Sequence, residues 1–503
     1  MPCYYKLSDD FELASWVDNI YSIVKKNNRE KVFLTQDEYI VLSMCDGTLD
    51  FSSCILPEKY IYIAKIFYQR NILSLFKDKV SNNIISIKKY AVPYIEKAQW
   101  SITGKCNYKC KHCYMSAPDG KYGELKTEQC FSIIKQLKDC GIDKIALTGG
   151  EPLIRKDFFK IVEKLKENNI EIYEIYTNGS LVNQKLLDNL NSIGVHPTFS
   201  ISFDGKGHHD WLRGVNGAEE LAIKAFRLLD KNGFRTTAEM CIYRSNLTTI
   251  RDTVQLLSSL NVSALKITPA SPSGLWQKNG KDENLSFKEI YDYYLEYLPY
   301  YFKDGSPIDI MLGGFFACEK NTREYMIPSI KFDGTDNCKN IPVCMSAKQN
   351  LYIAADGKVL PCISLTGLSE QEKYPSIIEH NLKEILLSSN YKKFISMTIE
   401  DYLNNNQECQ SCEYKYLCGG GCRAGALMSN GNYLKKDEAT CFIFKEKYPQ
   451  KIKNILISLS ISMLSSSCST ILEIITGNRK CAYPNCTERT SSNSAYCPYH
   501  KPY

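Results

Sequence analysis

The sequence has no long uninterrupted apolar run, which a membrane-spanning helix would need. The nearest approach, Ile455 to Leu472, carries no charge but contains seven serines, so we expect a packed helix there. The first ten residues also lack the apolar core of a secretion signal. We therefore predict neither a membrane span nor export.

An excess of charge of one sign is also missing. The 503 residues include 62 basic and 56 acidic side chains, for a net charge of +6. Proteins that bind nucleic acids usually gather far more positive charge on one face, so we expect no nucleic-acid partner. The 44% hydrophobic and 23% charged residues are typical of a folded chain, and the length predicts several domains.

Cysteine, in contrast, is abundant, with 22 residues. Disulfides would explain this number in a secreted protein, but the missing signal peptide argues against them. Two cysteine pairs, Cys110/Cys113 and Cys409/Cys412, are separated by two residues, a spacing that favours metal ligation in the reducing cytoplasm. The composition therefore predicts a cytoplasmic protein that binds metal.

Three of these cysteines, Cys106, Cys110 and Cys113, lie in one short loop, and Tyr114 follows directly. Three thiolates can hold three irons of a [4Fe–4S] cube and leave the fourth iron open to a substrate or cofactor. The alternative is a zinc knuckle, but zinc sites usually have four ligands. We therefore expect an iron–sulfur cluster with one open iron.

Short apolar strands alternate with amphipathic helices from residue 97 to about residue 300. Helices are expected at Thr127–Cys140 and Lys156–Asn168, and this alternation implies a parallel sheet with right-handed crossovers. The active site should lie at the carboxyl ends of the strands, where the connecting loops gather. The six expected strands are Gln99–Thr103, Lys144–Thr148, Ile172–Thr177, Thr198–Phe203, Thr237–Tyr243 and Ala264–Thr268.

A second short motif, Gly149-Gly150-Glu151, follows the second expected strand. The glycines let the backbone approach a ligand closely, and Glu151 brings a carboxylate. Such a motif alone is usually a turn, but here it occupies the loop next to the cysteine loop. Ser202 lies at the end of the fourth expected strand and Arg213 follows that strand, so both belong to the same edge of the sheet.

Together, the cysteine loop and the Gly-Gly-Glu motif resemble those of radical S-adenosylmethionine (SAM) enzymes. The resemblance implies an α/β fold with an open (β/α)6 partial barrel, in which the open iron chelates SAM and SAM is cleaved to a 5′-deoxyadenosyl radical. It places the glycine motif at the SAM amino group and the later residues near the SAM carboxylate or ribose. Asp204 either supports its loop or faces the substrate. The implied SAM contacts are Gly149, Gly150, Glu151, Ser202 and Arg213.

A second cysteine pattern runs from Cys344 to Cys441, with Gly357 after the first cysteine. It resembles the SPASM domain, a cysteine-rich extension of certain radical SAM enzymes. The alternative is two structural zinc sites. Without Cys338, the first auxiliary cluster would have an open iron able to bind a substrate thiol. The resemblance implies two auxiliary [4Fe–4S] clusters, the first held by Cys338, Cys344, Cys362 and Cys422 and the second by Cys409, Cys412, Cys418 and Cys441.

Residues 1 to 90 are expected to form a small N-terminal unit. Thr35 is expected to cap a helix with Glu38 at the capping-box position, and Ile61 to Phe67 to lie in a second helix. The pattern resembles winged-helix modules that recognise the leader of a ribosomally made precursor peptide, which adds as a strand at a sheet edge. The alternatives are a DNA-binding winged helix, which the weak charge disfavours, and a plain packing subdomain.

The last residues predict a further metal site. Four soft ligands stand in one short segment and suit zinc, with free thiols as the alternative: Cys481, Cys486, Cys497 and His500. The remaining cysteines are scattered, and most are expected to be small buried apolar groups: Cys3, Cys45, Cys54, Cys130, Cys140, Cys241, Cys318 and Cys468.

These features divide the chain into a leader-recognition unit (1–90), a radical SAM core (97–310), a SPASM domain (311–450) and a helical segment with a Cys/His tail (451–503). The resemblance implies an enzyme that crosslinks a ribosomal precursor peptide, with a thioether as the first expectation and flavodoxin or ferredoxin as electron donor. Alternatives are a carbon–carbon crosslink, a sulfatase-maturing enzyme and a non-enzymatic metal-dependent binding protein. Ile363 stands where the sulfatase-maturing group carries an aspartate. No side chain is identified as the catalytic base.

Overall fold

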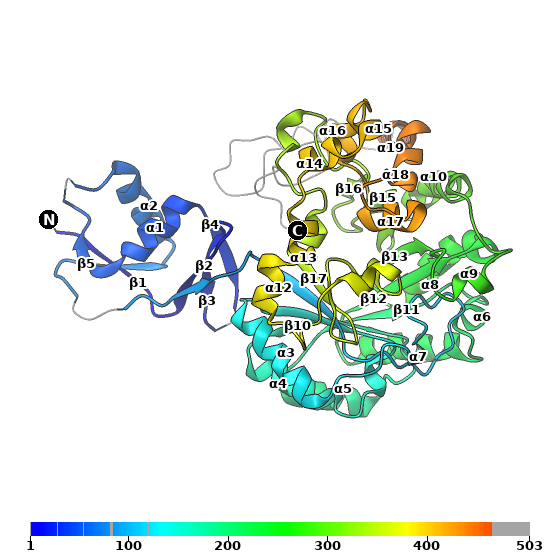
Figure 1. Ribbon diagram of the computed structural model, residues 1–503, viewed down its shortest axis with the longest axis horizontal. Helices are drawn as coiled ribbons and strands as arrows, with labels where there is room; N and C mark the ends of the chain where they lie inside the picture. The colour runs from blue at the N-terminus through cyan, green and yellow to red at the C-terminus, as the bar shows by residue number, and fades with distance from the viewer. Residues whose placement is uncertain (1, 28, 54, 81–83, 118–119, 465–503) are drawn as a thin grey trace. The chain divides into compact units, whose positions relative to one another are not determined.

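The computed structural model describes residues 2–27, 29–53, 55–80, 84–117 and 120–464 and divides into two compact units (Figure 1). The first unit comprises the residues up to Glu96 together with Lys135–Ile142 and Asn381–Ser388, and the second holds the other described residues. The predicted zinc ligands of the tail lie outside the described residues, as do Cys54 and Cys468.

The first unit contains two small sheets and two helices. One sheet has the order β5 (Asp46–Asp50), β1 (Tyr4–Leu7), β6 (Leu73–Phe76), and the other the order β4 (Lys31–Leu34), β3 (Tyr21–Lys25), β2 (Phe11–Trp16), β7 (Ile87–Tyr90). The helices are α1 (Gln36–Met44) and α2 (Glu58–Gln69). Thr35 caps α1, and Glu38 returns a hydrogen bond to the Thr35 backbone N–H at 2.8 Å, which confirms the predicted capping box.

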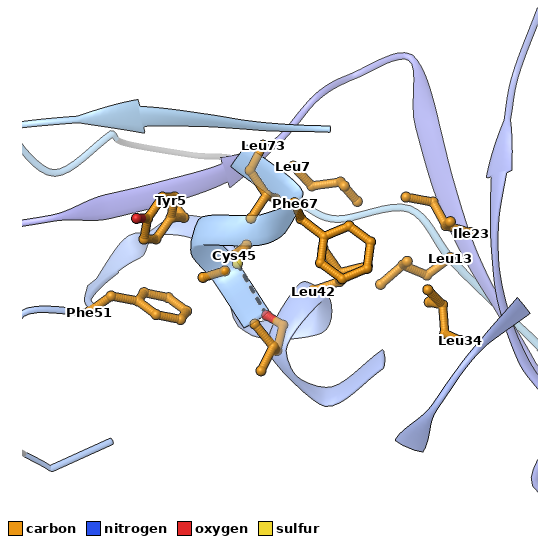
Figure 2. Close-up of a cluster of buried hydrophobic side chains, with 12 residues drawn as sticks. Tyr5, Leu7, Leu13, Ile23, Leu34, Leu42, Cys45, Phe51, Phe67 and Leu73 are labelled. Carbon is orange, nitrogen blue, oxygen red and sulfur yellow. Dashed lines mark hydrogen bonds between the residues drawn. The ribbon is translucent and has the colours of Figure 1, made fainter. Parts of the chain in front are cut away.

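The two helices and both sheets share one apolar core, shown in Figure 2. Leu42 and Cys45 from the end of α1 lie near Phe67 of α2, and the Cys45 thiol donates to the Val41 carbonyl at 3.1 Å. The Cys45 side chain therefore acts as a small core group, as predicted. This unit therefore has an apolar core of its own.

The second unit is built on an eleven-stranded sheet. Each of the six predicted strands is present, and all are parallel with their neighbours in chain order. They are β8 (Lys97–Ser101), β9 (Lys144–Thr148), β10 (Glu171–Thr177), β11 (Thr198–Ser202), β12 (Thr236–Ile242) and β13 (Ala264–Pro269). Because one end strand of this series does not pair with the other, the barrel is partial.

The sequence did not predict five further strands of this sheet. β14 (Asp309–Leu312) continues the parallel series after β13, and β17 (Asn350–Ile353) pairs in parallel with β8 on the opposite side. The antiparallel strands β15 (Phe316–Cys318), β16 (Tyr325–Met326) and β18 (Val359–Leu360) complete the edges. The cysteine-rich segment thus contributes strands to the same sheet as the core.

Amphipathic helices cover one side of this sheet. Figure 1 shows α4 (Phe158–Glu167), α5 (Gln184–Ile193) and α7 (Ala218–Lys231) along it. In α4, the buried residues Phe158, Ile161, Val162 and Leu165 recur at three- and four-residue spacing, which forms one apolar face. The other helices of this series are α3 (Thr127–Asp139), α8 (Ile250–Ser259) and α10 (Phe287–Lys303), with the short α6 (His209–Arg213) and α9 (Trp276–Asn279) between them.

Short helices form most of the cysteine-rich segment, and α14 to α18 gather on the other side of the strands in Figure 1. No helix in the described part of the chain is long and apolar enough to cross a bilayer. The helices are α11 (Met345–Gln349), α12 (Leu382–Ser388), α13 (Asn390–Ser396), α14 (Ile399–Asn404), α15 (Gln407–Gln410), α16 (Lys415–Cys418), α17 (Arg423–Asn430), α18 (Glu438–Lys445) and α19 (Tyr448–Leu464).

Candidate functional site

The three cysteines of the first motif lie in the loop after β8, at the carboxyl end of the parallel strands. All three are half-buried free thiols. Burial, together with the neighbouring Cys110 and Cys113 thiols, raises the pKa of Cys106 to about 12, so the three sulfurs interact electrostatically. A bound cation would reverse this effect and stabilise the thiolates.

Backbone amides already point at two of these sulfurs. The Tyr108 N–H donates to Cys106 Sγ and the Ala117 N–H to Cys113 Sγ, each at 3.4 Å. Hydrogen bonds of this kind stabilise the negative charge of cluster ligands. Three soft donors with amide support therefore fit a [4Fe–4S] cluster, for which Cys106, Cys110 and Cys113 would be the ligands.

Close packing of two glycines brings the second motif against this loop. A Cβ on Gly149 would lie 2.5 Å from the Thr103 carbonyl oxygen, and one on Gly150 would clash with the Lys105 carbonyl. The Gly150 N–H donates to the Thr103 carbonyl at 2.9 Å. Larger residues would therefore force the β9 loop away from the cysteine loop.

The Glu151 carboxylate is fully buried and forms hydrogen bonds with residues of its own loop and of the β10 loop. It accepts hydrogen bonds from Thr177 Oγ1 at 2.8 Å, the Asn178 N–H at 2.7 Å and the Leu153 N–H at 3.1 Å. Burial outweighs these bonds and raises the pKa of Glu151 to about 7. The side chain thus joins the β9 and β10 loops, while its contact with the SAM amino group stays a prediction.

Asp204 and Arg213 form a buried ion pair after β11. Arg213 Nε lies 2.6 Å from Asp204 Oδ2, and Nη2 lies 3.0 Å from Oδ1. His209 Nδ1 and the Cys241 N–H also lie 2.9 Å from this carboxylate. Burial opposes the charge of Asp204, but Arg213 and His209 hold the pKa of the carboxyl well below its usual range. In this structure Asp204 therefore supports the loop through Arg213, His209 and the Cys241 backbone, while a role toward the substrate is untested.

This pair also directs Arg213 toward the cysteine loop. Nη1 lies 4.0 Å from Cys110 Sγ, and the Lys111 N–H donates to the Leu212 carbonyl at 2.8 Å. Asp204 engages Nε and one N–H of Nη2, so the other N–H of Nη2 and both N–H groups of Nη1 stay available. A contact between Arg213 and the SAM carboxylate therefore stays a prediction.

Ser202 ends β11 and is half-buried, at the same edge of the sheet as the three motifs above. Its direct partner on β12 is Glu239. The half-buried His112 of the cysteine loop also interacts electrostatically with Arg213 and Asp204, and desolvation lowers its pKa to about 3. The sequence did not predict Glu239 or His112 as site residues, although a lone carboxylate in the apolar strand β12 is a visible signal.

Four thiols of the cysteine-rich segment interact electrostatically. The pKa of Cys441 is raised to about 12 by burial and by the thiols of Cys418 and Cys409. The Cys412 thiol also raises the pKa of Cys409. These interactions are consistent with the second predicted ligand set, Cys409, Cys412, Cys418 and Cys441, which stays a prediction.

The first predicted auxiliary set is only partly assembled. The Cys422 thiol lies in the field of Cys362 and Cys344, and burial is the main reason that its pKa is raised to about 11. The Ser364 and Gly425 N–H groups donate to Cys362 Sγ and Cys422 Sγ at 3.4 and 3.3 Å. Cys338 is buried with its thiol 3.4 Å from the Thr335 carbonyl, so its ligation stays a prediction.

Two side chains beside the second set were not predicted. The Tyr402 hydroxyl lies 3.1 Å from Cys409 Sγ, and the Arg423 guanidinium lies 4.2 Å from the centre of the Tyr402 ring. Arg423 is only 1% exposed, and its Nε and Nη2 have no hydrogen-bond partner among the described residues. A buried cation with orphaned donors requires negative charge nearby, which fits the anionic shell of an iron–sulfur cluster.

The described residues contain no group of three or more His, Cys, Asp or Glu side chains close enough to chelate a single ion. The ligand sets therefore rest on shared electrostatic environments and on soft donors. The scattered cysteines Cys130, Cys140 and Cys318 are buried as predicted, whereas Cys3 is half-buried. Cys241 is half-buried too, and its thiol lies in the fields of Asp204, Arg213 and Cys110.

Comparisons with known proteins bear on both halves of this site. A model of the radical SAM superfamily matches residues 100–257, and SPASM, an iron–sulfur cluster-binding domain, matches residues 344–413. An AdoMet-dependent heme synthase of Methanosarcina barkeri is 26% identical over 67% of this chain and 94% of that protein. The antilisterial bacteriocin subtilosin biosynthesis protein AlbA of Bacillus subtilis is 22% identical over 85% of this chain and 88% of that protein.

The crystal structure of Streptococcus suis SuiB bound to S-adenosylmethionine covers 87% of this chain and 99% of its own, with a TM-score of 0.59 at 16% identity, which shows a shared fold. The two matched ranges contain the cysteine loop after β8 and, in the cysteine-rich segment, Cys344, Cys362, Cys409 and Cys412. Their cofactors are [4Fe–4S] clusters and SAM, for which the donor sets above are suited. The chain therefore contains a radical SAM domain followed by a SPASM iron–sulfur cluster-binding domain.

Proposed function

We propose that this enzyme modifies a ribosomally made precursor peptide by installing a crosslink, with a thioether as the first expectation. The observation that carries the proposal is the first unit, which folds around its own core and presents an open sheet edge. A small-molecule enzyme has no need of such a module, whereas a peptide enzyme uses one to hold the leader.

The open edge is formed by β4, which pairs with β3 alone among the described strands. Two of its apolar side chains, Val32 and Phe33, are 45% and 47% exposed. Exposed apolar edge strands favour pairing with another chain. We therefore propose that the leader peptide adds to β4 as a further strand, and that the winged-helix prediction describes this module.

Two of the comparisons support a peptide substrate. AlbA, a bacteriocin biosynthesis protein, matches 85% of this chain, and SuiB has also been solved with a bound precursor peptide, SuiA. The heme synthase matches a smaller share, 67%. The first unit would bind the leader if the substrate is a peptide, but it has no evident role if the substrate is a heme precursor. We therefore prefer a peptide substrate.

The residues of the chain act on SAM and peptide by position and charge. The cluster and SAM, when bound, supply a 5′-deoxyadenosyl radical able to abstract a hydrogen atom. Gly149 and Gly150 keep the β9 loop against the cysteine loop, and Asp204 holds Arg213 beside Cys110. Two auxiliary clusters, the tail zinc, a flavodoxin or ferredoxin donor and a cytoplasmic location remain parts of the proposal.

The test is an anaerobic reaction of the reconstituted enzyme with SAM, reductant and a cysteine-containing precursor peptide. Mass spectrometry should show the loss of two hydrogen atoms per crosslink, and fragmentation should place the new bond at a cysteine sulfur. A carbon–carbon bond would keep the peptide function and reject the thioether. An aldehyde at the cysteine would indicate formylglycine formation instead.

One further outcome would reject the peptide function itself: SAM cleavage that depends on a heme precursor and not on any peptide. A leader peptide that binds equally well after the first unit has been removed would keep the peptide function and reject only the role given to β4.

A further inference from the structure

A cross-strand ion pair lies on the half-buried face of β12 and β13. Lys266 Nζ lies 3.2 Å from Glu239 Oε2, and the two residues are direct partners in the parallel register. In β12, buried residues alternate with half-buried ones, and Glu239 shares the half-buried face with Cys241. The Cys241 thiol lies in the fields of Cys110 and Arg213, so this face is the one that meets the SAM site.

The register extends this face toward the predicted SAM contacts. Ser202 of β11 is the direct partner of Glu239, just as Lys266 is on the other side. Side chains of directly paired residues on neighbouring strands lie on the same face of a sheet. Ser202, Glu239 and Lys266 therefore form one row across three strands.

Lys266, at one end of this row, lies toward the first predicted auxiliary ligand set. Lys266 lowers the pKa of the Cys362 thiol, against the larger effect of burial, so the ammonium lies in the field of that predicted cluster ligand. The Lys266 side chain is 46% exposed and that of Glu239 is 29% exposed, so both are open to a bound substrate. The pair thus lies between the predicted SAM contacts and the first auxiliary ligand set.

Three further charged or titratable groups act on Glu239. Arg213 of α6 contributes a positive charge near Glu239, and Glu174 and Tyr176 of β10 interact electrostatically with the Glu239 carboxylate. Burial is the largest effect and raises the pKa of Glu239, while Lys266 and then Arg213 oppose it. A carboxylate in this environment is a better proton acceptor than an exposed one.

The proposed crosslinking reaction requires such an acceptor. One hydrogen leaves the peptide as an atom, which the SAM-derived radical takes. When the new bond forms, the second hydrogen leaves as a proton and one electron is left over, for which an oxidised iron–sulfur cluster held by the predicted auxiliary ligands would be the acceptor. This balance holds for a thioether and for a carbon–carbon bond alike, and in both cases the proton needs a base.

Resting on the proposed function, we infer that Glu239 is the base that takes this proton from the substrate, and that Lys266 positions its carboxylate. The row from Ser202 to Lys266 places the base where the peptide has to lie, between the site of hydrogen abstraction and the site of electron departure. The role is that of a catalytic residue for Glu239 and of a positioning residue for Lys266.

The first test separates hydrogen abstraction from bond formation. Glu239→Gln keeps the shape of the side chain but removes the base, so the yield of crosslinked peptide should fall by about 100-fold. Peptide-dependent 5′-deoxyadenosine formation, including transfer of deuterium from labelled peptide, should stay within about twofold because no proton moves in that step. The matched control is Glu171→Gln, since Glu171 pairs directly with Lys144 at the opposite ends of the strands. It should leave both yields unchanged.

The second test uses the pH dependence. Lys266→Gln removes a positive charge that lowers the pKa of Glu239, so this pKa should rise and the acidic limb of product formation should move to higher pH. Glu239→Gln should abolish that limb. In the unreduced holoenzyme, infrared difference spectra should show a carboxyl band that titrates, is absent in Glu239→Gln and shifts to higher pH in Lys266→Gln.

Three results would overturn this inference. They are full crosslinking by Glu239→Gln, a parallel loss of 5′-deoxyadenosine that marks Glu239 as a SAM contact, and an infrared titration that Lys266→Gln does not shift. If the unaltered enzyme crosslinks no peptide at all, the proposed function fails instead. The infrared titration then still decides whether Glu239 is coupled to Lys266.

Discussion

At the scale of single residues, two buried carboxyl groups at one sheet edge have opposite pKa shifts. Glu151 has only neutral hydrogen-bond donors, so burial dominates and raises its pKa. Asp204 has Arg213 and His209 beside it, which outweigh burial and lower its pKa. The partner and not the burial therefore decides which carboxylate is ionised.

Asp204→Asn tests the buried ion pair. The change would leave Arg213 buried without its counter-charge, so the free energy of unfolding should fall by about 3–5 kcal/mol. Urea denaturation under anaerobic conditions measures it. The matched control is Asp304→Asn, because Asp304 holds Arg251 in a similar two-pronged pair, but Arg251 is 39% exposed. Equal losses in the two variants would contradict this account.

Tyr402→Phe tests the surroundings of the second auxiliary set. The Asn406 amide donates to the Tyr402 oxygen at 3.1 Å, which leaves the hydroxyl proton for Cys409 Sγ. Losing one hydrogen bond to a ligand sulfur should lower the reduction potential of that cluster by about 40 mV. Electron paramagnetic resonance during a redox titration measures it.

The control for this change is Tyr391→Phe, since the buried Tyr391 hydroxyl has no hydrogen-bond partner among the described residues. It should leave every potential unchanged. An unchanged potential in Tyr402→Phe as well would mean that Cys409 is not a cluster ligand or that the hydroxyl faces the Lys435 carbonyl, 3.3 Å away.

At the scale of elements, the strands that could be predicted are those whose own sequence is regular. β8 to β13 are largely apolar, have similar lengths and are separated by amphipathic helices. Each strand can therefore be recognised from its own sequence. β14 and β17 have four residues each, and β17 pairs with β8 across about 250 residues of sequence, which no local pattern reveals. The formation of β14 and β17 therefore depends on pairing with distant strands and not on local sequence propensity.

The site follows the same rule. Cys106, Cys110 and Cys113 were predicted because cluster chemistry fixes their spacing in one loop. The row from Ser202 to Lys266 depends on register between three strands, and Arg423 is recognised only through its burial and its orphaned donors. Motifs within one loop could therefore be predicted, whereas contacts between elements could not.

The open edge of β4 gives a prediction at this scale. Val32→Lys places a charge on the exposed side of the edge strand and should weaken leader-peptide binding by about tenfold, a usual cost for losing an apolar contact at an interface. Fluorescence anisotropy of a labelled leader measures it. The control is Val17→Lys, because Val17 follows β2 and is equally apolar and 55% exposed. Equal effects of the two changes would argue against β4.

At the scale of the whole molecule, the core and the cysteine-rich segment belong to one compact unit apart from Lys135–Ile142 and Asn381–Ser388, although the sequence divides them at residue 310. β17 of that segment pairs with β8, the strand that leads into the cysteine loop. Gly367 approaches the Tyr114 carbonyl so closely that a Cβ would clash with it. The SAM cluster loop and the auxiliary segment are thus built as one structure, which suits electron transfer between them.

The central claim is that Cys106, Cys110 and Cys113 hold a cluster with one open iron at which SAM is cleaved. The direct measurement is the amount of 5′-deoxyadenosine formed from SAM by the anaerobically reconstituted enzyme after reduction. The account predicts reductant-dependent formation that is abolished when all three are changed to serine and is retained in Cys3→Ser. Undiminished 5′-deoxyadenosine formation by the triple variant would contradict it.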